Sequence, residues 1–263
     1  MTPTAAATAR PDTAAPLLLE VAALRFAYGE RVAVDGGGFA IRRGEIFGLL
    51  GPNGAGKSTT LKCLCGLLAP AGGALALAGR PFSPAESAED RRAVGIVPQE
   101  LALYADLTAR ENLAFFGELC GLRGAPLAAA VARGLALAGL AERADERVKT
   151  FSGGMKRRLN LAAGDLHDPS LLLLDEPTAG VDPQSRNHLF EALEALRKAG
   201  KTLLYTTHYM EEAQRLCDRI AIVDGGRVLA IGTAAELAAH AGMPGADLEA
   251  VFLKLTGRRL RDA

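Results

Sequence analysis

A glycine-rich loop that ends in a lysine and two hydroxyl residues is the strongest indication of chemistry in the sequence. The pattern GxxxxGK[ST] comes directly after a short apolar run, Ile46–Leu50. Glycines let successive backbone N–H groups point at phosphate oxygens, and the helix that follows adds its positive N-terminus. The lysine is expected to reach the β- and γ-phosphates and the first hydroxyl to bind Mg²⁺. The predicted phosphate-binding residues are Gly51, Pro52, Asn53, Gly54, Ala55, Gly56, Lys57, Ser58 and Thr59.

Two adjacent carboxylates follow another apolar run. Leu171–Leu174 is typical of a buried strand, and Asp175 and Glu176 stand at its C-terminal end, the edge where open α/β sheets bind ligands. Asp175 is the expected second partner of Mg²⁺, directly or through water. Glu176 is expected to polarise an attacking water, a role worth about 10²–10⁴-fold in rate. Paired acids at strand ends are also common on protein surfaces, so this interpretation depends on the glycine-rich loop.

A third segment, Ser152-Gly153-Gly154, precedes an amphipathic helical pattern. Ser152 suits a helix N-cap, and the two glycines leave backbone amides open to an approaching anion. The plainer interpretation is a capped helix after a glycine turn. The position of the segment between the glycine-rich loop and the carboxylate pair favours anion binding.

These segments, in this order, resemble the ATPase domains of the ABC family. GPNGAGKST resembles the Walker A motif, FSGGM the signature motif and LLLLDEP the Walker B motif. The Q-loop is matched by Val97-Pro98-Gln99, the D-loop by Ala179-Gly180-Val181-Asp182 and the H-loop by Thr206-Thr207-His208. Tyr28 stands where the family has an aromatic residue that stacks on adenine. The resemblance covers about residues 17–233.

The resemblance implies ATP and Mg²⁺ held between two copies of the domain. The Walker A loop of one copy would face Ser152-Gly153-Gly154 of the other, and Asp182 would link the two sites. Without the resemblance, Gln99 is equally well a plain loop residue and His208 a strand-end histidine. The implied catalytic residues are Lys57, Gln99, Glu176 and His208, and the implied metal ligands are Ser58, Gln99 and Asp175.

Two positions depart from the family pattern. Met155 replaces the usual Gln at the end of the signature, and Val181 replaces the usual Leu of the D-loop. We therefore expect no nucleotide contact from the side chain of Met155. SGGMKRR, TTHYMEEA and the tail Leu248–Gly257 resemble the ATP-binding subunits of type-2 ABC exporters, which include drug-resistance and polysaccharide systems. The tail is equally compatible with an ordinary amphipathic helix.

The elements that must position these residues alternate between extended and helical patterns. Leu17–Phe26 and Arg31–Ile41 predict antiparallel strands, Asp182-Pro183 predicts a helix start, and Asp218–Thr233 predicts a hairpin. Short apolar runs, typical of parallel strands buried on both faces, are Ile46–Leu50, Ala93–Val97, Leu171–Leu174 and Thr202–Thr206. With the resemblance, the expected fold class is α/β. It has a P-loop NTPase (RecA-like) parallel-sheet core, an antiparallel β subdomain and an inserted α-helical subdomain.

Three parts are expected along the chain. Residues 1–16 predict a flexible N-terminal tail and residues 17–235 the ABC ATPase domain. The helical subdomain lies within that domain at about residues 101–160. Residues 236–263 predict a C-terminal helical extension.

Composition and charge exclude several classes. The 263 residues carry 30 basic and 30 acidic side chains, so no strong field draws the chain to nucleic acid or anionic lipid. Its apolar stretches fall short of the roughly 18–20 residues that cross a bilayer. The first 16 residues lack the basic leader and apolar core of a signal peptide. The four cysteines show no paired spacing and are expected to pack as small hydrophobic residues.

The expected function is ATP hydrolysis that drives export through a separate polytopic transmembrane permease subunit. A second ATPase subunit, identical or different, would complete the pair. The chain would lie in the cytoplasm, peripheral on the inner face of the membrane, with a coupling helix of the permease near Gln99–Thr108. The alternative is a soluble ABC-type ATPase that acts on nucleic acid or ribosomes. Such relatives usually carry coiled coils, zinc modules or fused ATPase copies, which the sequence does not show, so no nucleic-acid partner is expected.

Overall fold

Ten strands in two sheets form the centre of the part that the structure describes. The structure is a computed structural model that describes residues 15–257. Most of the predicted tail (1–14) and the end of the predicted C-terminal extension (258–263) lie outside the described residues. The strands are β1 (Leu17–Tyr28), β2 (Arg31–Arg42), β3 (Ile46–Leu50), β4 (Gly72–Leu77), β5 (Arg80–Pro81), β6 (Val94–Val97), β7 (Leu171–Asp175), β8 (Thr202–Thr207), β9 (Arg219–Asp224) and β10 (Arg227–Gly232).

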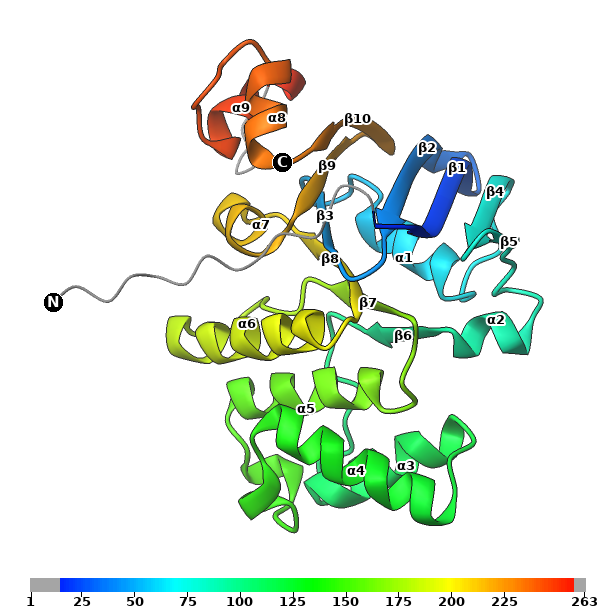
Figure 1. Ribbon diagram of the computed structural model, residues 1–263, viewed down its shortest axis with the longest axis vertical. Helices are drawn as coiled ribbons and strands as arrows, with labels where there is room; N and C mark the ends of the chain where they lie inside the picture. Colours follow the sequence, from blue (N-terminus) through cyan, green and yellow to red (C-terminus); the bar gives the residue numbers. More distant parts are fainter. Residues whose placement is uncertain (1–14, 258–263) are drawn as a thin grey trace, which may run out of the picture.

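Helices cover the sheets and form a separate lobe (Figure 1). Among the described residues, none of them is both long and apolar enough to cross a bilayer. The α-helices are α1 (Lys57–Leu64), α2 (Ala88–Arg92), α3 (Ala109–Leu119), α4 (Gly124–Ala138), α5 (Gly153–Asp165), α6 (Pro183–Lys198), α7 (Met210–Leu216), α8 (Ala234–His240) and α9 (Leu248–Thr256), and the 3₁₀ turns are η1 (Ala141–Arg143) and η2 (Val148–Thr150).

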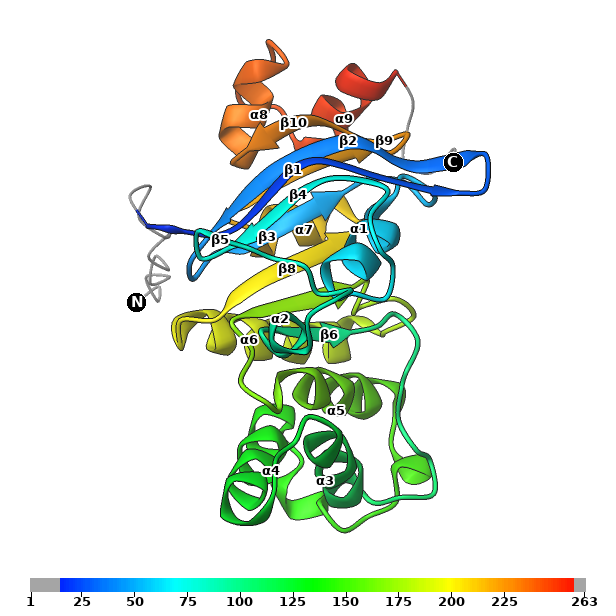
Figure 2. The same cartoon turned by 90° about the vertical axis from the view of Figure 1, so that its right-hand side faces the viewer.

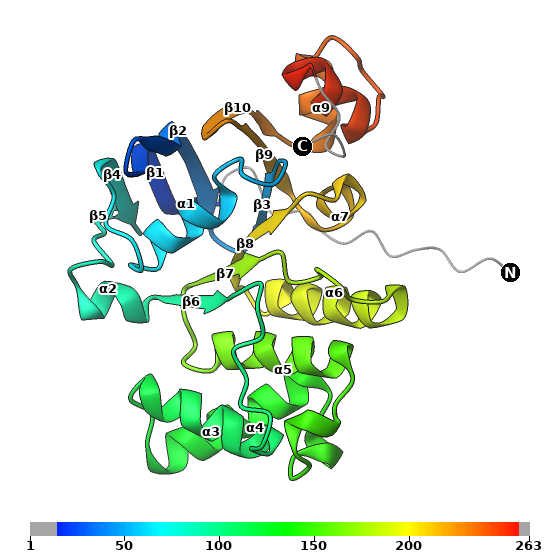
Figure 3. The ribbon, with the colours of Figure 1, turned by 180° about the vertical axis from the view of Figure 1, so that it is seen from behind.

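The six-stranded sheet has the order β10-β9-β3-β8-β7-β6 and is parallel except for β10. Every residue of β3 and β7 is buried, as expected for strands covered on both faces. α1 covers one face, and α6 and α7 cover the other (Figures 1 and 3). Because β8 lies between β3 and β7 and runs parallel to both, the carboxyl ends of all three strands lie at one edge of the sheet. The glycine-rich loop, the two acids and His208 all follow at that edge.

The antiparallel sheet, of order β2-β1-β4-β5, lies over α1 (Figure 2). Its apolar residues join those of α1 and β3 in one core, which includes Leu19, Ile41, Phe47 and Leu61. β1 ends at Tyr28, beside the edge that carries the glycine-rich loop. The predicted antiparallel subdomain is thereby confirmed, and it brings an aromatic residue to the phosphate-binding loop.

The α3–α5 lobe has its own apolar core, in which Leu113, Leu135, Phe151 and Leu159 are buried. Thr108 begins α3 with a reciprocal capping box: its side chain accepts from Glu111 N–H, while the Glu111 carboxylate accepts from Thr108 N–H. The region predicted to be mostly helical therefore contains α3, α4 and both 3₁₀ turns. The lobe joins the sheet through α5, which packs on α6.

Packing also accounts for the cysteines. All four are free, and Cys63 is fully buried. Burial raises the pKa of the Cys63 thiol to about 11 and that of Cys217 still further. These thiols remain protonated at neutral pH, which agrees with the predicted packing role.

Candidate functional site

The glycine-rich loop turns tightly between β3 and α1. Gly56 caps α1 at φ 99°, and a Cβ atom there would lie 2.4 Å from the carbonyl oxygen of Ala33. A Cβ atom at Gly51 would lie 2.2 Å from the carbonyl oxygen of Val223. Both positions therefore require glycine. Since Gly56 has no side chain to cap the helix, the first amides of α1 stay available to an anion.

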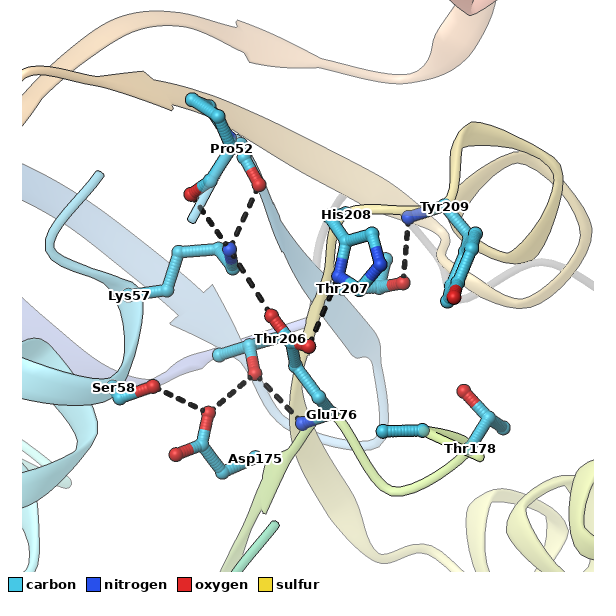
Figure 4. Close-up of polar contacts among 12 residues, drawn as sticks. Pro52, Lys57, Ser58, Asp175, Glu176, Thr178, Thr206, Thr207, His208 and Tyr209 are labelled. Carbon is cyan, nitrogen blue, oxygen red and sulfur yellow. Dashed lines mark hydrogen bonds and ion pairs between the residues drawn. The ribbon is translucent and has the colours of Figure 1, made fainter. Parts of the chain in front are cut away.

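Lys57 lies buried across this loop, with 4% of its surface exposed (Figure 4). Its Nζ donates to the carbonyl oxygens of Gly51 at 2.8 Å and Pro52 at 3.0 Å. It also forms an ion pair with Oε1 of Glu176 at 3.2 Å. Burial lowers the pKa of Lys57, and the Glu176 carboxylate opposes that shift. The structure thus pairs the lysine and the acid that the sequence predicted as catalytic.

Glu176 lies between the side chains of Lys57 and His208. Its Oε1 faces Lys57, and its Oε2 lies 2.9 Å from Nδ1 of His208. Its backbone N–H donates to Oγ1 of Thr206 at 3.0 Å. The residue has φ 43°, a left-handed conformation that costs energy outside glycine and that recurs at functional sites. Backbone and side-chain contacts together fix the carboxylate at the mouth of the loop.

Ser58 and Asp175 provide the oxygen atoms suited to Mg²⁺. The Ser58 hydroxyl donates to Oδ1 of Asp175 at 2.9 Å, and Thr206 Oγ1 donates to the same oxygen at 2.8 Å. Hydroxyl and carboxylate oxygens are hard donors, and Mg²⁺ commonly takes one or two protein ligands plus phosphates and water. Within residues 15–257 there is no group of three or more His, Cys, Asp or Glu side chains that suits a metal. Ser58 and Asp175 offer a hydroxyl and a carboxylate oxygen, which fit Mg²⁺ bound by few protein ligands.

A pocket of about 330 Å³ opens in front of these residues. Tyr28 is 48% exposed at its rim and packs edge-on against Phe26, with ring centroids 4.9 Å apart. Arg31 and Ala33 also line the pocket and were not predicted; the one available signal was a basic residue just after the turn that follows Tyr28. The lining residues are Tyr28, Arg31, Ala33, Asn53, Gly54, Gly56, Lys57, Ser58, Thr59, Gln99 and Glu176.

Several predicted residues lie outside that lining. Gly51, Pro52 and Ala55 shape the loop from behind, while Asp175 and His208 reach the lining through Ser58 and Glu176. A second group lies at the starts of α5 and α6, apart from the pocket of the same chain: Ser152, Gly153, Gly154 and Asp182.

The starts of α5 and α6 touch each other. Ser152 caps α5 by accepting from Met155 N–H, and Asp182 caps α6 by accepting from Ser185 N–H at 3.0 Å. These contacts with Ser185 hold the pKa of Asp182 below its usual value. A Cβ atom at Gly154 would lie 2.1 Å from Ser185 Oγ, so the close approach requires glycine. The signature segment and the D-loop helix therefore meet directly.

Arg157 joins the loop of Gln99 to the loop of Ala179, a role that was not predicted from the sequence. From α5 it donates to the carbonyl oxygen of Gln99 and, at 2.8 Å, to that of Ala179. Partial burial lowers the pKa of its guanidinium. One side chain of the helical lobe thus holds both the Q-loop and the D-loop.

The family model described as "ABC transporter" matches residues 34–179. The linearmycin resistance ATP-binding protein LnrL of Bacillus subtilis is 48% identical over 86% of this chain and 72% of its own length. The Nod factor export ATP-binding protein I of Ralstonia nicotianae is 47% identical over 85% of this chain and 69% of its own length.

A solved structure described as the ATP-binding subunit of an ABC transporter superposes with a TM-score of 0.80. It is 34% identical and covers 91% of this chain and 99% of its own. None of these matches supports the alternative of an ATPase that acts on nucleic acid or ribosomes. Motif geometry, family model, relatives and fold agree, and the chain belongs to the ABC transporter family as an ATP-binding subunit, the ATP-hydrolysing motor of a transporter.

Proposed function

We propose that this chain powers export through a separate membrane permease, by hydrolysing ATP at the pocket in front of Lys57. One observation carries the site assignment: Lys57, Ser58 and Glu176 line that pocket, Lys57 pairs with Glu176 at 3.2 Å, and Asp175 accepts from Ser58 at 2.9 Å. The names of the two relatives, a resistance protein and an export protein, support the direction of transport.

Each residue has a role in this proposal. Lys57 and the loop amides bind the phosphates, and Glu176 polarises water. Gln99, which lines the pocket, and His208, which contacts Glu176, would follow the γ-phosphate. Ser58, Asp175 and Gln99 would hold Mg²⁺, which supplies charge neutralisation to the phosphates when bound.

A second ATPase subunit completes the site in this proposal. Ser152, Gly153, Gly154 and Asp182 lie apart from the pocket of their own chain, at two helix starts that touch. The exposed Gly153 at the start of α5 leaves room for a phosphate that is held by another copy to approach the helix N-terminus. We place the nucleotide between the loop of one subunit and this segment of the next.

The permease is proposed to dock in a groove between the sheet and the α3–α5 lobe. The groove measures about 500 Å³ and has an apolar wall, with Ile96 and Pro98 on one side and Phe116 and Leu119 on the other. Leu119 is 68% exposed, so this wall of the groove presents apolar surface to solvent. Docking there would place the chain in the cytoplasm, on the inner face of the membrane. It also makes the helical region, about residues 101–160, the lobe that receives the permease.

Affinity capture tests the permease partner. Tagged Glu176→Gln protein, with ATP and Mg²⁺, is expected to recover one polytopic membrane protein in near-equal amount from solubilised source membranes. Leu119→Glu in the same background should lose that protein, while Leu229→Glu, on the exposed edge strand β10, should retain it. Recovery of ribosomal or nucleic-acid partners alone would overturn the transporter assignment but leave the ATPase chemistry untouched.

The rim residue Tyr28 gives a milder test of the nucleotide position. Tyr28→Ala removes the aromatic face that is proposed to stack on adenine, and stacked aromatic contacts are worth about 0.5–1.5 kcal/mol beyond area burial. We expect ATP to bind about 2- to 10-fold more weakly, with kcat nearly unchanged. Titration with a fluorescent ATP analogue measures this, and Tyr104→Ala, which changes an equally exposed tyrosine away from the pocket, is the control. Equal affinities for Tyr28→Ala and wild type would place the adenine elsewhere.

A further inference from the structure

A buried carboxylate on α7 lies behind the ATP site and has no role in the function described so far. Glu212 is 2% exposed, and three hydroxyl groups donate to its Oε2. The donors are Thr178 Oγ1, Tyr205 OH and Thr207 Oγ1, each at 2.9 Å. All three donors are themselves almost fully buried. Burial and the adjacent carboxylate raise the pKa of Tyr205 well above its usual value, so its hydroxyl remains a donor.

Two of the donors belong to the loops that carry the proposed catalytic groups. Thr178 follows Glu176 by two residues, and Thr207 directly precedes His208. Figure 4 shows these loops on opposite sides of the Glu176–His208 contact. Thr207 Oγ1 also accepts from the backbone N–H of Tyr209 at 2.9 Å. One oxygen of Glu212 therefore ties the loop after Glu176 to the loop around His208.

All three hydrogen bonds run in the same direction, toward Glu212, and this common direction restricts the conformation of the loops. An ionised carboxylate only accepts hydrogen bonds, so each of the three hydroxyl groups donates its proton to Glu212. Thr207 Oγ1 is then left with lone pairs and can accept from Tyr209 N–H, which sets the backbone on both sides of His208. A neutral amide at position 212 presents N–H donors as well, and the pattern loses its single direction.

Arg186 extends the cluster to α6, one turn after Asp182. Its Nε lies 3.5 Å from Oε1 of Glu212, and its guanidinium lies 5.6 Å from the ring centroid of Tyr209. Within residues 15–257 neither Nε nor Oε1 makes a hydrogen bond, although both are buried. A small shift of α6 would bring the Arg186 guanidinium close enough to form a charge-assisted hydrogen bond with Oε1 of Glu212.

We propose that Glu212 is a positioning residue for ATP hydrolysis, which holds the Glu176 and His208 loops in register and connects both to the D-loop helix through Arg186. The inference rests on the roles proposed above for Glu176 and His208. Glu212 does not touch the pocket lining, so it acts on the reaction only through those loops.

Matched variants that each remove one buried hydroxyl separate positioning from simple stability. Thr207→Val removes the bond to Glu212 and the bond from Tyr209 N–H, which belongs to the His208 loop. Tyr205→Phe, in the middle of β8, removes a bond to Glu212 of equal length and a 3.3 Å contact with Thr178 Oγ1. Both lose one buried hydroxyl, and we expect a similar fall in Tm. Thr207→Val and Glu212→Gln should lower kcat about 10- to 100-fold with KM for ATP nearly unchanged, a typical effect of losing a supporting shell. Tyr205→Phe should keep kcat within about twofold of wild type.

The same assays show when the inference fails. If Thr207→Val and Tyr205→Phe alter kcat equally, or Glu212→Gln hydrolyses ATP at the wild-type rate, Glu212 is a structural residue only. A failure of the proposed function looks different, because Glu176→Gln itself would then retain hydrolysis whatever position 212 holds. Folding is checked by Tm, and Thr207→Val stands as the deciding variant if Glu212→Gln does not fold.

The Arg186 arm has its own matched pair. Arg215 also joins α7 to α6, through a 2.7 Å bond to Asn187 and a guanidinium 4.7 Å from the ring centroid of Phe190. Among the described residues it forms no hydrogen bond or ion pair with Glu212. Arg186→Gln should lower kcat and the Hill coefficient for ATP, while Arg215→Gln should leave both unchanged. Equal behaviour of the two variants would remove α6 from the cluster.

Discussion

Lys57→Ala is expected to abolish ATP hydrolysis, with a loss of at least about 10²–10³-fold, the size of effect seen when one preorganised charge contact to a reacting group is removed. The lysine is the cation that lies in the pocket beside Glu176, and the loop carbonyls hold its amine in place. Without it, the phosphates lose the buried cation that lies closest to Glu176 in the pocket. ATP binding should therefore weaken together with the rate.

The measurement is steady-state phosphate release with a parallel ATP-binding titration. Lys62→Ala removes an exposed lysine from the same short helix and should behave as wild type. Loss of Lys57 also leaves the buried Glu176 carboxylate without its lysine partner, so a lower Tm is expected as well. Wild-type turnover in Lys57→Ala would show that the phosphates bind elsewhere.

Glu176→Gln is expected to separate binding from hydrolysis. The amide has nearly the same shape as the carboxylate, but it cannot accept a proton from water, so kcat should fall about 10²–10⁴-fold. ATP binding should persist, since the loop amides, Lys57 and Ser58 remain. Two subunits that hold unhydrolysed ATP should then accumulate as a stable pair.

Gel filtration with and without ATP, combined with the hydrolysis rate, measures both effects. Glu211→Gln makes the same change of charge on an exposed glutamate of α7 and is the control. Hydrolysis at the wild-type rate in Glu176→Gln would assign the base to another residue. A low rate without an ATP-dependent pair would instead contradict the shared site that we propose between two subunits.

The sequence predicted best those features that neighbouring residues determine. The glycine-rich loop, the acids after an apolar run and the N-cap at Asp182 are all local patterns, and the structure shows β3, β7 and α6 where they were expected. Parallel pairing then brings the strand ends together without any further information. That is why the local motifs were sufficient to predict a common site.

Contacts between distant segments were not predictable from such patterns. β4, β5 and α2 are short and weakly patterned, so their residues gave no prediction of a strand or helix. Glu211 and Glu212 are chemically identical neighbours, yet one is exposed and the other is buried beneath three hydroxyls. Only the packing of α7 against β8 distinguishes them. Arg157 was missed for the same reason, since its partners lie 58 and 22 residues away.

The ion pair between Lys57 and Glu176 has a consequence for how the subunit resets after each cycle. The carboxylate is an internal anion already bound to the lysine, so an incoming phosphate must compete with it for the same cation. That competition would weaken the binding of every nucleotide, and it would matter most for ADP, which lacks the γ-phosphate. The group that we propose as the catalytic base would therefore also favour the release of ADP and return the empty site to its starting state.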